Sequence, residues 1–508
     1  MLKKEKISLT SQVIKGSFWN TLTSIVQRVG GLIITIILAR VLLPEGFGTY
    51  NLVLSIALLF TLFTEGGINS AVVRYLSETN NNKKKTKLCF QYILKLKIII
   101  LLISSGLLIL LVFPLSFIVF KKPVILIPLI IASFFIFIFS LGNFFNSLFF
   151  AIKKVKYITL KEFIYQFSRV LIITLAIWLS FFHLNTAYVM IILTISSLIA
   201  LLFIFYKTYI LSPYLFKKQE LNSFLAKEDK KRILNFTFII TITSISYLLL
   251  GNIDTLMFGA LVNDITQLGI YRSAFTLASS IAGLFALGQV LLPIFVQVKK
   301  IRLGEAFNKV LKYSMAFAIP ATFGLAVLSS YFIVLIYGYE YIEATIPLII
   351  LSFLIIPFVQ ISLFSCLFLA KERLKEYTYF LIAIIMINIF LNYAFIKLFL
   401  YYLPNFIVIG VAIATLLSWF FYSIGLEIIA RKKLKIQSDI TLFIKPIFAS
   451  LVMVMIISLL KIRFVTLNLV SGFFLVFSGI LIYFLTMWLI KGINKEDFLL
   501  IREIFIKH

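Results

Sequence analysis

Long apolar runs, separated by short polar segments, follow one another along the whole chain. Each run reaches about 20 residues, the length that a helix needs to cross the hydrocarbon core of a bilayer. The runs and their breakers predict fourteen membrane spans, with approximate bounds 13–38, 48–75, 88–113, 123–151, 157–182, 186–208, 233–261, 267–297, 309–336, 345–370, 377–399, 405–429, 441–461 and 466–490. The pattern therefore predicts an all-α integral membrane protein.

Composition supports this reading. Of the 508 residues, 61% are hydrophobic and 13% are charged, and the mean hydropathy is +1.07. Soluble domains contain only about 45–50% apolar residues. The two cysteines and two histidines, Cys89, Cys366, His183 and His508, predict neither a disulfide framework nor a metal site.

The positive charge lies mainly on one side of the predicted topology. With the N-terminus inside, 39 of the 48 Lys and Arg residues fall on inward segments and 7 on outward ends, while Arg28 and Arg169 lie inside spans. This bias predicts a multi-pass protein of the cell membrane with both termini in the cytoplasm. The net charge of +28 is thus explained by topology, and nucleic acid is not an expected partner.

The chain also resembles itself. "LFFAIKKVKY" at 148–157 matches "LFLAKERLKEY" at 367–377, and "GTY" at Gly48 matches "GIY" at Gly269, with offsets of 219 and 221 residues. Such a repeat contains six helices, and both copies start on the same side of the membrane, which is a transporter architecture. The alternative is chance similarity between apolar segments of low complexity.

The repeat predicts two parallel six-helix lobes followed by two C-terminal helices. The predicted parts are an N-terminal lobe, a cytoplasmic amphipathic linker, a C-terminal lobe and a final segment with two spans and a cytoplasmic tail, at residues 1–208, 209–232, 233–430 and 431–508.

The segment from Gly16 to Glu78 resembles the opening of polysaccharide-biosynthesis flippases of the Wzx type. Its motifs are Ala39-Arg40, Pro44-x-Gly46-x-Gly48-x-Tyr50, and Gly66-Gly67 followed by Arg74. These flippases belong to the multidrug/oligosaccharidyl-lipid/polysaccharide exporter superfamily, together with multidrug extruders (MATE) and lipid II flippases. The resemblance implies two lobes around a V-shaped cavity, alternating access and a lipid-linked oligosaccharide as cargo. It further implies membrane lipids, a polysaccharide polymerase and other assembly proteins as partners.

Polar residues in the first span suggest where cargo binds. They recur at steps of three or four residues and share one helix face: Asn20, Ser24, Gln27, Arg28, Gly31 and Thr35. An arginine facing lipid would cost about 2.5–3.5 kcal/mol, so we expect Arg28 to face a hydrated cavity, where it could bind a diphosphate. The alternative is a packing role in which Arg28 pairs with Glu65.

Two further arginines are candidates for the same cavity. Arg272 begins a polar stripe on the eighth span, and a plain interfacial anchor is its alternative role. Arg169 shares a face of the fifth span with Glu162 and Gln166, so it could instead belong to a local polar network. The candidate substrate-binding residues are Arg28, Arg272, Asn20, Gln27 and Arg169.

Intramembrane carboxylates mark ion sites or counter-ions. Glu65 and Asp254 lie well inside predicted spans, so either could couple transport to H⁺ or Na⁺. For Asp254 the alternative is an ion pair that fixes the geometry of its lobe. We expect Gly66 and Gly67 to let a neighbouring backbone approach Glu65 closely. No other cofactor is expected.

These features predict a flippase that moves an isoprenyl-diphosphate-linked oligosaccharide, such as an O-antigen, capsule or exopolysaccharide unit, from the inner to the outer leaflet. A cation-coupled multidrug exporter and a lipid II flippase of the same fold remain alternatives. An enzyme is not expected, because the sequence contains no nucleotide-binding glycine loop and no long outward loop for a catalytic domain.

Overall fold

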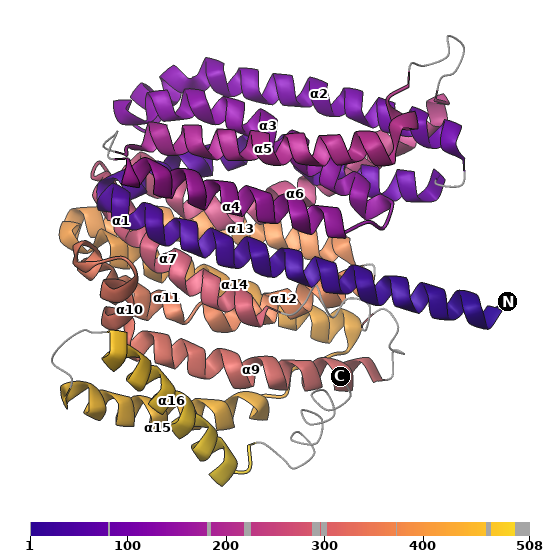
Figure 1. The fold of residues 1–508 in the computed structure, drawn as a ribbon. Helices are drawn as coiled ribbons and strands as arrows, with labels where there is room; N and C mark the ends of the chain where they lie inside the picture. Colours follow the sequence, from indigo (N-terminus) through magenta and orange to yellow (C-terminus); the bar gives the residue numbers. More distant parts are fainter. Residues whose placement is uncertain are drawn as a thin grey trace. The chain divides into compact units, whose positions relative to one another are not determined.

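The computed structural model describes residues 2–79, 82–179, 184–217, 225–286, 295, 302–371, 373–463 and 469–492. In these residues all regular structure is helical (Figure 1). The chain divides into two compact units, Met1–Gly269 and Ile270–His508, which we call the first and the second unit.

The described residues of the first unit form six long helices before the start of α7. They are α1 (Leu2–Thr79), α2 (Lys83–Pro114), α3 (Leu126–Ala151), α4 (Lys156–Trp178), α5 (Thr186–Leu211) and α6 (Lys227–Leu261). Short helical turns join some of them: η1 (Leu115–Val119), η2 (Pro123–Ile125) and η3 (Pro213–Leu215). The longest helix, α1, packs against α2, α3, α4 and α6, and α3 also packs against α2 and α5.

Helix α1 is broken near its middle. Leu43 has a non-helical backbone, with φ of 57° and ψ of 175°, and Pro44 follows it. Proline removes a helical hydrogen bond and restricts the residue before it, which explains why the break falls here. The break separates the first two predicted spans.

The second unit begins within α7 (Ile265–Phe285) and contains the remaining helices. They are α9 (Leu303–Val327), α10 (Ser329–Ile336), η5 (Tyr339–Ala344), α11 (Thr345–Ser352), α12 (Ile355–Ala370), α13 (Leu374–Tyr402), η6 (Pro404–Phe406), α14 (Ile407–Leu434), α15 (Thr441–Arg463) and α16 (Leu469–Leu489). Within this unit, α14 packs against α11, α12 and α13, while α15 packs against α9 and α16.

The described helices coincide with the predicted spans, apart from parts of 267–297 and 466–490 that lie outside the described residues. Among the described residues, ten helices are long and apolar enough to cross a membrane, or twelve if two bent pairs each form one span, so the predicted number of fourteen is not confirmed. The difference arises because α1 counts as one helix despite its break, and α4 carries too many charges. The protein is a multi-pass membrane protein.

The glycines beside Glu65 have the predicted packing role. A Cβ atom on Gly67 would collide with the carbonyl oxygen of Thr237 on α6, and the Gly67 N–H donates to Thr241 Oγ1 at 3.1 Å. On Gly66 it would lie 2.7 Å from the Cβ of Ser244, also on α6. Glycine is therefore required for the close approach of α1 and α6.

The predicted linker 209–232 is described only in part. Its described residues form the end of α5, the turn η3 and the start of α6, and residues 218–224 lie outside the described part of the chain, as does the C-terminal tail from residue 493. The proposed lobe bounds stay a prediction.

Candidate functional site

Helix α4 carries most of its polar residues on the buried side. Lys161, Glu162 and Arg169 are 3%, 4% and 9% exposed, whereas Phe163 and Phe167 are each 57% exposed. A membrane helix that presents phenylalanine outward and charges inward needs polar partners inside the protein. The buried face of α4 is therefore the natural place to look for a site.

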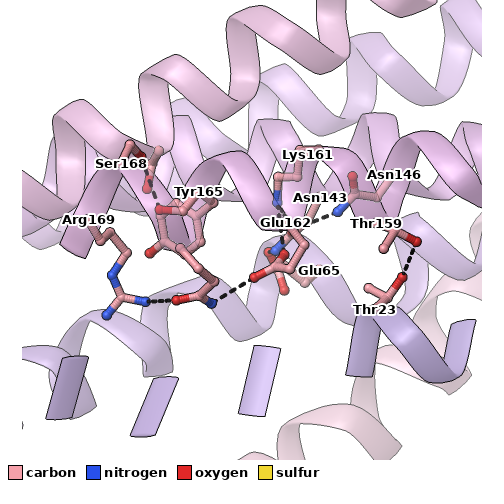
Figure 2. A network of polar contacts seen from close by, with 12 residues as sticks. Thr23, Glu65, Asn143, Asn146, Thr159, Lys161, Glu162, Tyr165, Ser168 and Arg169 are labelled. Carbon is pink, nitrogen blue, oxygen red and sulfur yellow. Dashed lines mark hydrogen bonds and ion pairs between the residues drawn. The ribbon is translucent and has the colours of Figure 1, made fainter. Parts of the chain in front are cut away.

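A chain of polar contacts runs along this face (Figure 2). Arg169 Nη1 donates to Gln166 Oε1 at 3.1 Å, and Gln166 Nε2 donates to Glu162 Oε1 at 2.9 Å. Lys161 Nζ lies 3.7 Å from Glu162 Oε2, forming a buried ion pair. Arg169 thus belongs to the local polar network that its spacing from Glu162 and Gln166 predicts.

The chain continues to Glu65. Lys161 Nζ donates to Asn143 Oδ1 at 3.5 Å, and Asn143 Nδ2 donates to Glu65 Oε1 at 2.8 Å. Asn143 on α3 therefore connects the charges of α4 with the carboxylate of α1 (Figure 2). Among the described residues Glu65 forms no ion pair with Arg28, so the alternative that pairs these two side chains is not realised in this conformation.

A second buried cation lies nearby. The side chain of Lys97 on α2 is fully buried, and its Nζ donates to the Thr64 carbonyl at 2.6 Å and to Ser140 Oγ at 2.9 Å. The positive-charge count places Lys97 and Lys161 on inward flanks, and this topology stays a prediction. The structure adds that both side chains are buried between helices of the first unit.

Beside the network lies a pocket of about 300 Å³ within the first unit. Helices α1, α3, α4 and α5 supply its lining. The polar residues of the lining are Gln27, Asn143, Glu162, Gln166 and Arg169, and the aromatic residues are Tyr50, Phe135, Phe139 and Tyr165. Two of the predicted binding residues, Gln27 and Arg169, therefore share one pocket.

The other predicted residues lie elsewhere. Asn20 and Arg28 are exposed on the first half of α1. Asp254 on α6 is 2% exposed, and its neighbour Asn252 accepts a hydrogen bond from Ser55 at 3.2 Å. Arg272 on α7 is half-buried in the second unit, with its guanidinium 5.1 Å from the ring centre of Phe275.

Sequence reasoning missed two contributors to the network, Lys161 and Asn143, and also the buried Lys97 beside it. Lys161 precedes Glu162 directly, and adjacent residues on a helix do not normally face each other. Asn143 lies five residues before the first residue of the aligned repeat segment at 148–157. A signal for it was present, since an amide inside the apolar run 123–151 needs a polar partner.

The second unit has a pocket of a different kind. Its volume is about 370 Å³, and α7, α9, α10, α15 and α16 supply a lining of apolar side chains and glycines with one phenol. That phenol, Tyr483, donates to the Ala316 carbonyl at 2.6 Å. The pocket therefore suits an aliphatic occupant.

Solved structures of transporters share this fold. The lipid II flippase MurJ in an inward closed conformation superposes with a TM-score of 0.73 at 19% identity, covering 94% of this chain and 98% of that chain. An inward-facing multidrug resistance MATE family transporter of the MOP superfamily superposes with a TM-score of 0.63 at 15% identity, covering 80% and 94%. At these identities the likeness shows a common fold.

Sequence comparison supplies the family. No curated protein sequence matches the chain. A family model described as polysaccharide biosynthesis protein matches residues 13–299, which is more than half of the 508 residues. The match includes the opening segment with its glycine motifs and every residue of the polar network. This chain belongs to the polysaccharide biosynthesis protein family.

Proposed function

We propose that the protein is a flippase that moves an isoprenyl-diphosphate-linked oligosaccharide from the inner to the outer leaflet by alternating access. The observation that carries the proposal is the family match over residues 13–299, on a fold shared with a lipid flippase. In this role the protein acts in the cell membrane, with both termini in the cytoplasm, beside a polymerase and other assembly proteins.

The proposed cargo consists of a diphosphate, an oligosaccharide and an isoprenoid chain. The protein has residues that suit the diphosphate and residues that suit the isoprenoid chain. Arg28 is exposed on α1, so its guanidinium is available to the diphosphate, which it can bind through two parallel hydrogen bonds. We propose the apolar pocket of the second unit as the site of an isoprenoid segment, because its lining is apolar except for the Tyr483 phenol, whose hydroxyl is already bonded to the Ala316 carbonyl.

Coupling to an ion belongs to the same proposal. Glu65 is held by Asn143, and Asp254 is buried on α6. Each is a candidate for binding H⁺ or Na⁺ during the transport cycle, because carboxylates inside membrane proteins commonly mark ion pathways and proton relays.

The proposal is tested by a flipping assay in proteoliposomes with a fluorescent isoprenyl-diphosphate oligosaccharide. We expect the wild-type protein to flip this lipid and Arg28→Ala to be slower by at least about tenfold, the effect of losing one charge-assisted contact. Arg28→Lys keeps the charge but loses the planar fork, so it should retain an intermediate rate.

Arg431→Ala is the matched control, because Arg431 is an exposed arginine in the last turn of α14. It should flip at the wild-type rate. A wild-type protein that moves no lipid-linked sugar but expels a cationic dye under an ion gradient would contradict the proposal and identify a multidrug exporter.

A further inference from the structure

The lining of the first unit's pocket combines two sets of side chains, which we call its aromatic and its polar wall. Tyr50, Phe135, Phe139 and Tyr165 supply aromatic rings, and Phe135 stacks on Phe139 with 5.2 Å between ring centres. The polar wall consists of side-chain amides, a carboxylate and a guanidinium. A volume of about 300 Å³ is at the lower end of the range for small-molecule sites, so the pocket holds a single small ring rather than a chain of them.

The guanidinium of Arg169 has unused hydrogen-bonding capacity. In the described part of the chain one hydrogen bond engages it, from Nη1 to Gln166, although an arginine carries five N–H donors. Among the described residues its buried Nε has no hydrogen-bond partner, and its Cζ lies 4.9 Å from the centre of the Tyr165 ring. Buried polar groups normally have hydrogen-bond partners. Because the Arg169 side chain is only 9% exposed and has unused donors, we expect a ligand to supply the missing acceptor.

The charges of the lining argue against a strongly anionic occupant. Arg169 and Glu162 are one cation and one anion, joined through Gln166, so a diphosphate in the pocket would meet a carboxylate. A hydroxyl group, in contrast, both donates and accepts. It can donate to the Glu162 carboxylate and accept from Arg169 at the same time.

The polar wall is also held in place before any ligand binds. Gln166 is bonded at both ends of its amide, and Glu162 is fixed by Gln166 and Lys161. Groups that are already oriented lose little conformational entropy on binding. Gln27, which is exposed on α1, belongs to the lining as well, so the pocket reaches a surface from which a ligand can enter.

From this arrangement we infer that the pocket between α1, α3, α4 and α5 is a binding site for one neutral sugar ring. A pyranose has a face of C–H groups for the aromatic wall and a rim of hydroxyls for the polar wall. The inference rests on the proposed function, in which the cargo carries sugars, and it assigns one of them to a site inside the first unit.

The test measures sugar binding without transport. The full chain is reconstituted in nanodiscs, and saturation-transfer NMR is recorded with the methyl glycosides of a hexose and of an N-acetylhexosamine at millimolar concentrations. We expect saturation of ring protons in the wild-type sample. Phe139→Leu and Gln27→Leu should each weaken binding by about tenfold, because each removes one wall contact.

Phe167→Leu is the matched control. It makes the same substitution on α4 at a phenylalanine that is 57% exposed and outside the pocket lining, so binding should be unchanged. Gln27 is exposed, and its substitution leaves the buried network intact, which keeps the test valid if a buried variant fails to fold. Arg169→Gln should also weaken binding, and Arg169→Lys should restore part of it.

Three results would overturn the inference. The first is the absence of saturation transfer in the wild-type sample, and the second is wild-type binding in both Phe139→Leu and Gln27→Leu. The third is displacement of the glycoside by inorganic diphosphate that binds more tightly, which would make the pocket an anion site.

The two proposals fail separately. A protein that binds the glycosides but flips no lipid-linked oligosaccharide retains the sugar site and loses the flippase role. A protein that flips the lipid, with no effect from Phe139→Leu and no glycoside binding, retains the flippase role and loses the sugar site.

Discussion

At the scale of single residues, the first unit contains several charged side chains that are buried among neutral polar groups. Lys161 and Glu162 form an ion pair in which both side chains are at most 6% exposed, and Lys97 is bonded to a carbonyl and a hydroxyl. Removing two charges from water costs free energy, and this cost offsets much of the Coulomb attraction between them. Removing only one partner leaves a buried, unpaired charge. Such groups are therefore expected to be sensitive to single substitutions.

Lys161→Met should destabilise the protein by about 3–5 kcal/mol, because Glu162 is then buried without its cation. Lys161→Met combined with Glu162→Leu should recover most of this loss, since the double variant buries no unpaired charge. Thermal unfolding in detergent measures both. Lys154→Met, at an exposed turn lysine, is the control. Equal loss in the single and double variants would show that the pair is not energetically coupled.

Sequence reasoning reached part of this network. The spacing of Glu162, Gln166 and Arg169 places them on one helix face, and the structure joins them by hydrogen bonds. Lys97 could not be placed, because a lysine near a basic flank looks the same in sequence whether it faces water or protein. Its depth depends on Thr64 and Ser140, which come from other helices.

At the scale of helices, close backbone contacts and end caps decide the packing of the first unit. Gly67 lets α1 approach α6, and Lys122 terminates α6 by donating to the carbonyls of Gly259 at 2.8 Å and Val262 at 2.7 Å. Burial lowers the pKa of the Lys122 ammonium, because burial disfavours the charged form. Its two hydrogen bonds offset this loss, since the last-turn carbonyls of a helix otherwise lack partners.

Gly67→Ala should destabilise the protein by about 1–3 kcal/mol, the usual cost of overpacking, because the new methyl group meets the Thr237 carbonyl. Gly106→Ala on α2 is the matched control, since a Cβ there has no heavy atom within 4 Å. It should be neutral or stabilising by up to about 1 kcal/mol. Melting temperatures of the two variants in one detergent decide the point, and equal values would refute the contact argument.

Lys122→Met should cost about 1–3 kcal/mol for each carbonyl that is left buried and unpaired. The neighbouring Lys121 is exposed, so Lys121→Met should have little effect. Hydrogen exchange at the C-terminal turn of α6 should rise in Lys122→Met alone. Unchanged exchange would mean that the cap does not hold this turn.

At the scale of the whole molecule, hydropathy predicts the helical membrane fold, and the opening glycine motifs predict the family. Both follow from local features, namely the length of apolar runs and the spacing of small residues. Hydropathy alone does not determine the number of spans. Helix α1 is continuous in length but contains a break between two predicted spans. Helix α4 is long enough to cross a membrane but carries several charges, so length and composition give different answers for it.

The apolar pocket of the second unit gives a prediction for transport. Gly324 lines it, and among the described residues a Cβ there meets only the terminal methyl of Met453, at 3.8 Å, so Gly324→Leu extends into the pocket. We expect this variant to slow flipping of a cargo with a long isoprenoid chain at least about tenfold and to spare one with a short chain. Parallel flipping assays with both lipids make the comparison. An equal effect on the two would exclude a role of this pocket in holding the tail.

The break in α1 has a consequence for synthesis of the protein. A leucine in the backbone conformation of Leu43 costs about 1–3 kcal/mol and persists only when its surroundings enforce it. Part of that support is Gly269 of α7, at which even a Cβ atom would collide with the Pro44 carbonyl. The ribosome makes Gly269 more than 200 residues after Leu43. The first two spans therefore enter the membrane before the backbone between them can adopt its final conformation. That conformation is stabilised only after α7 has been synthesised and inserted.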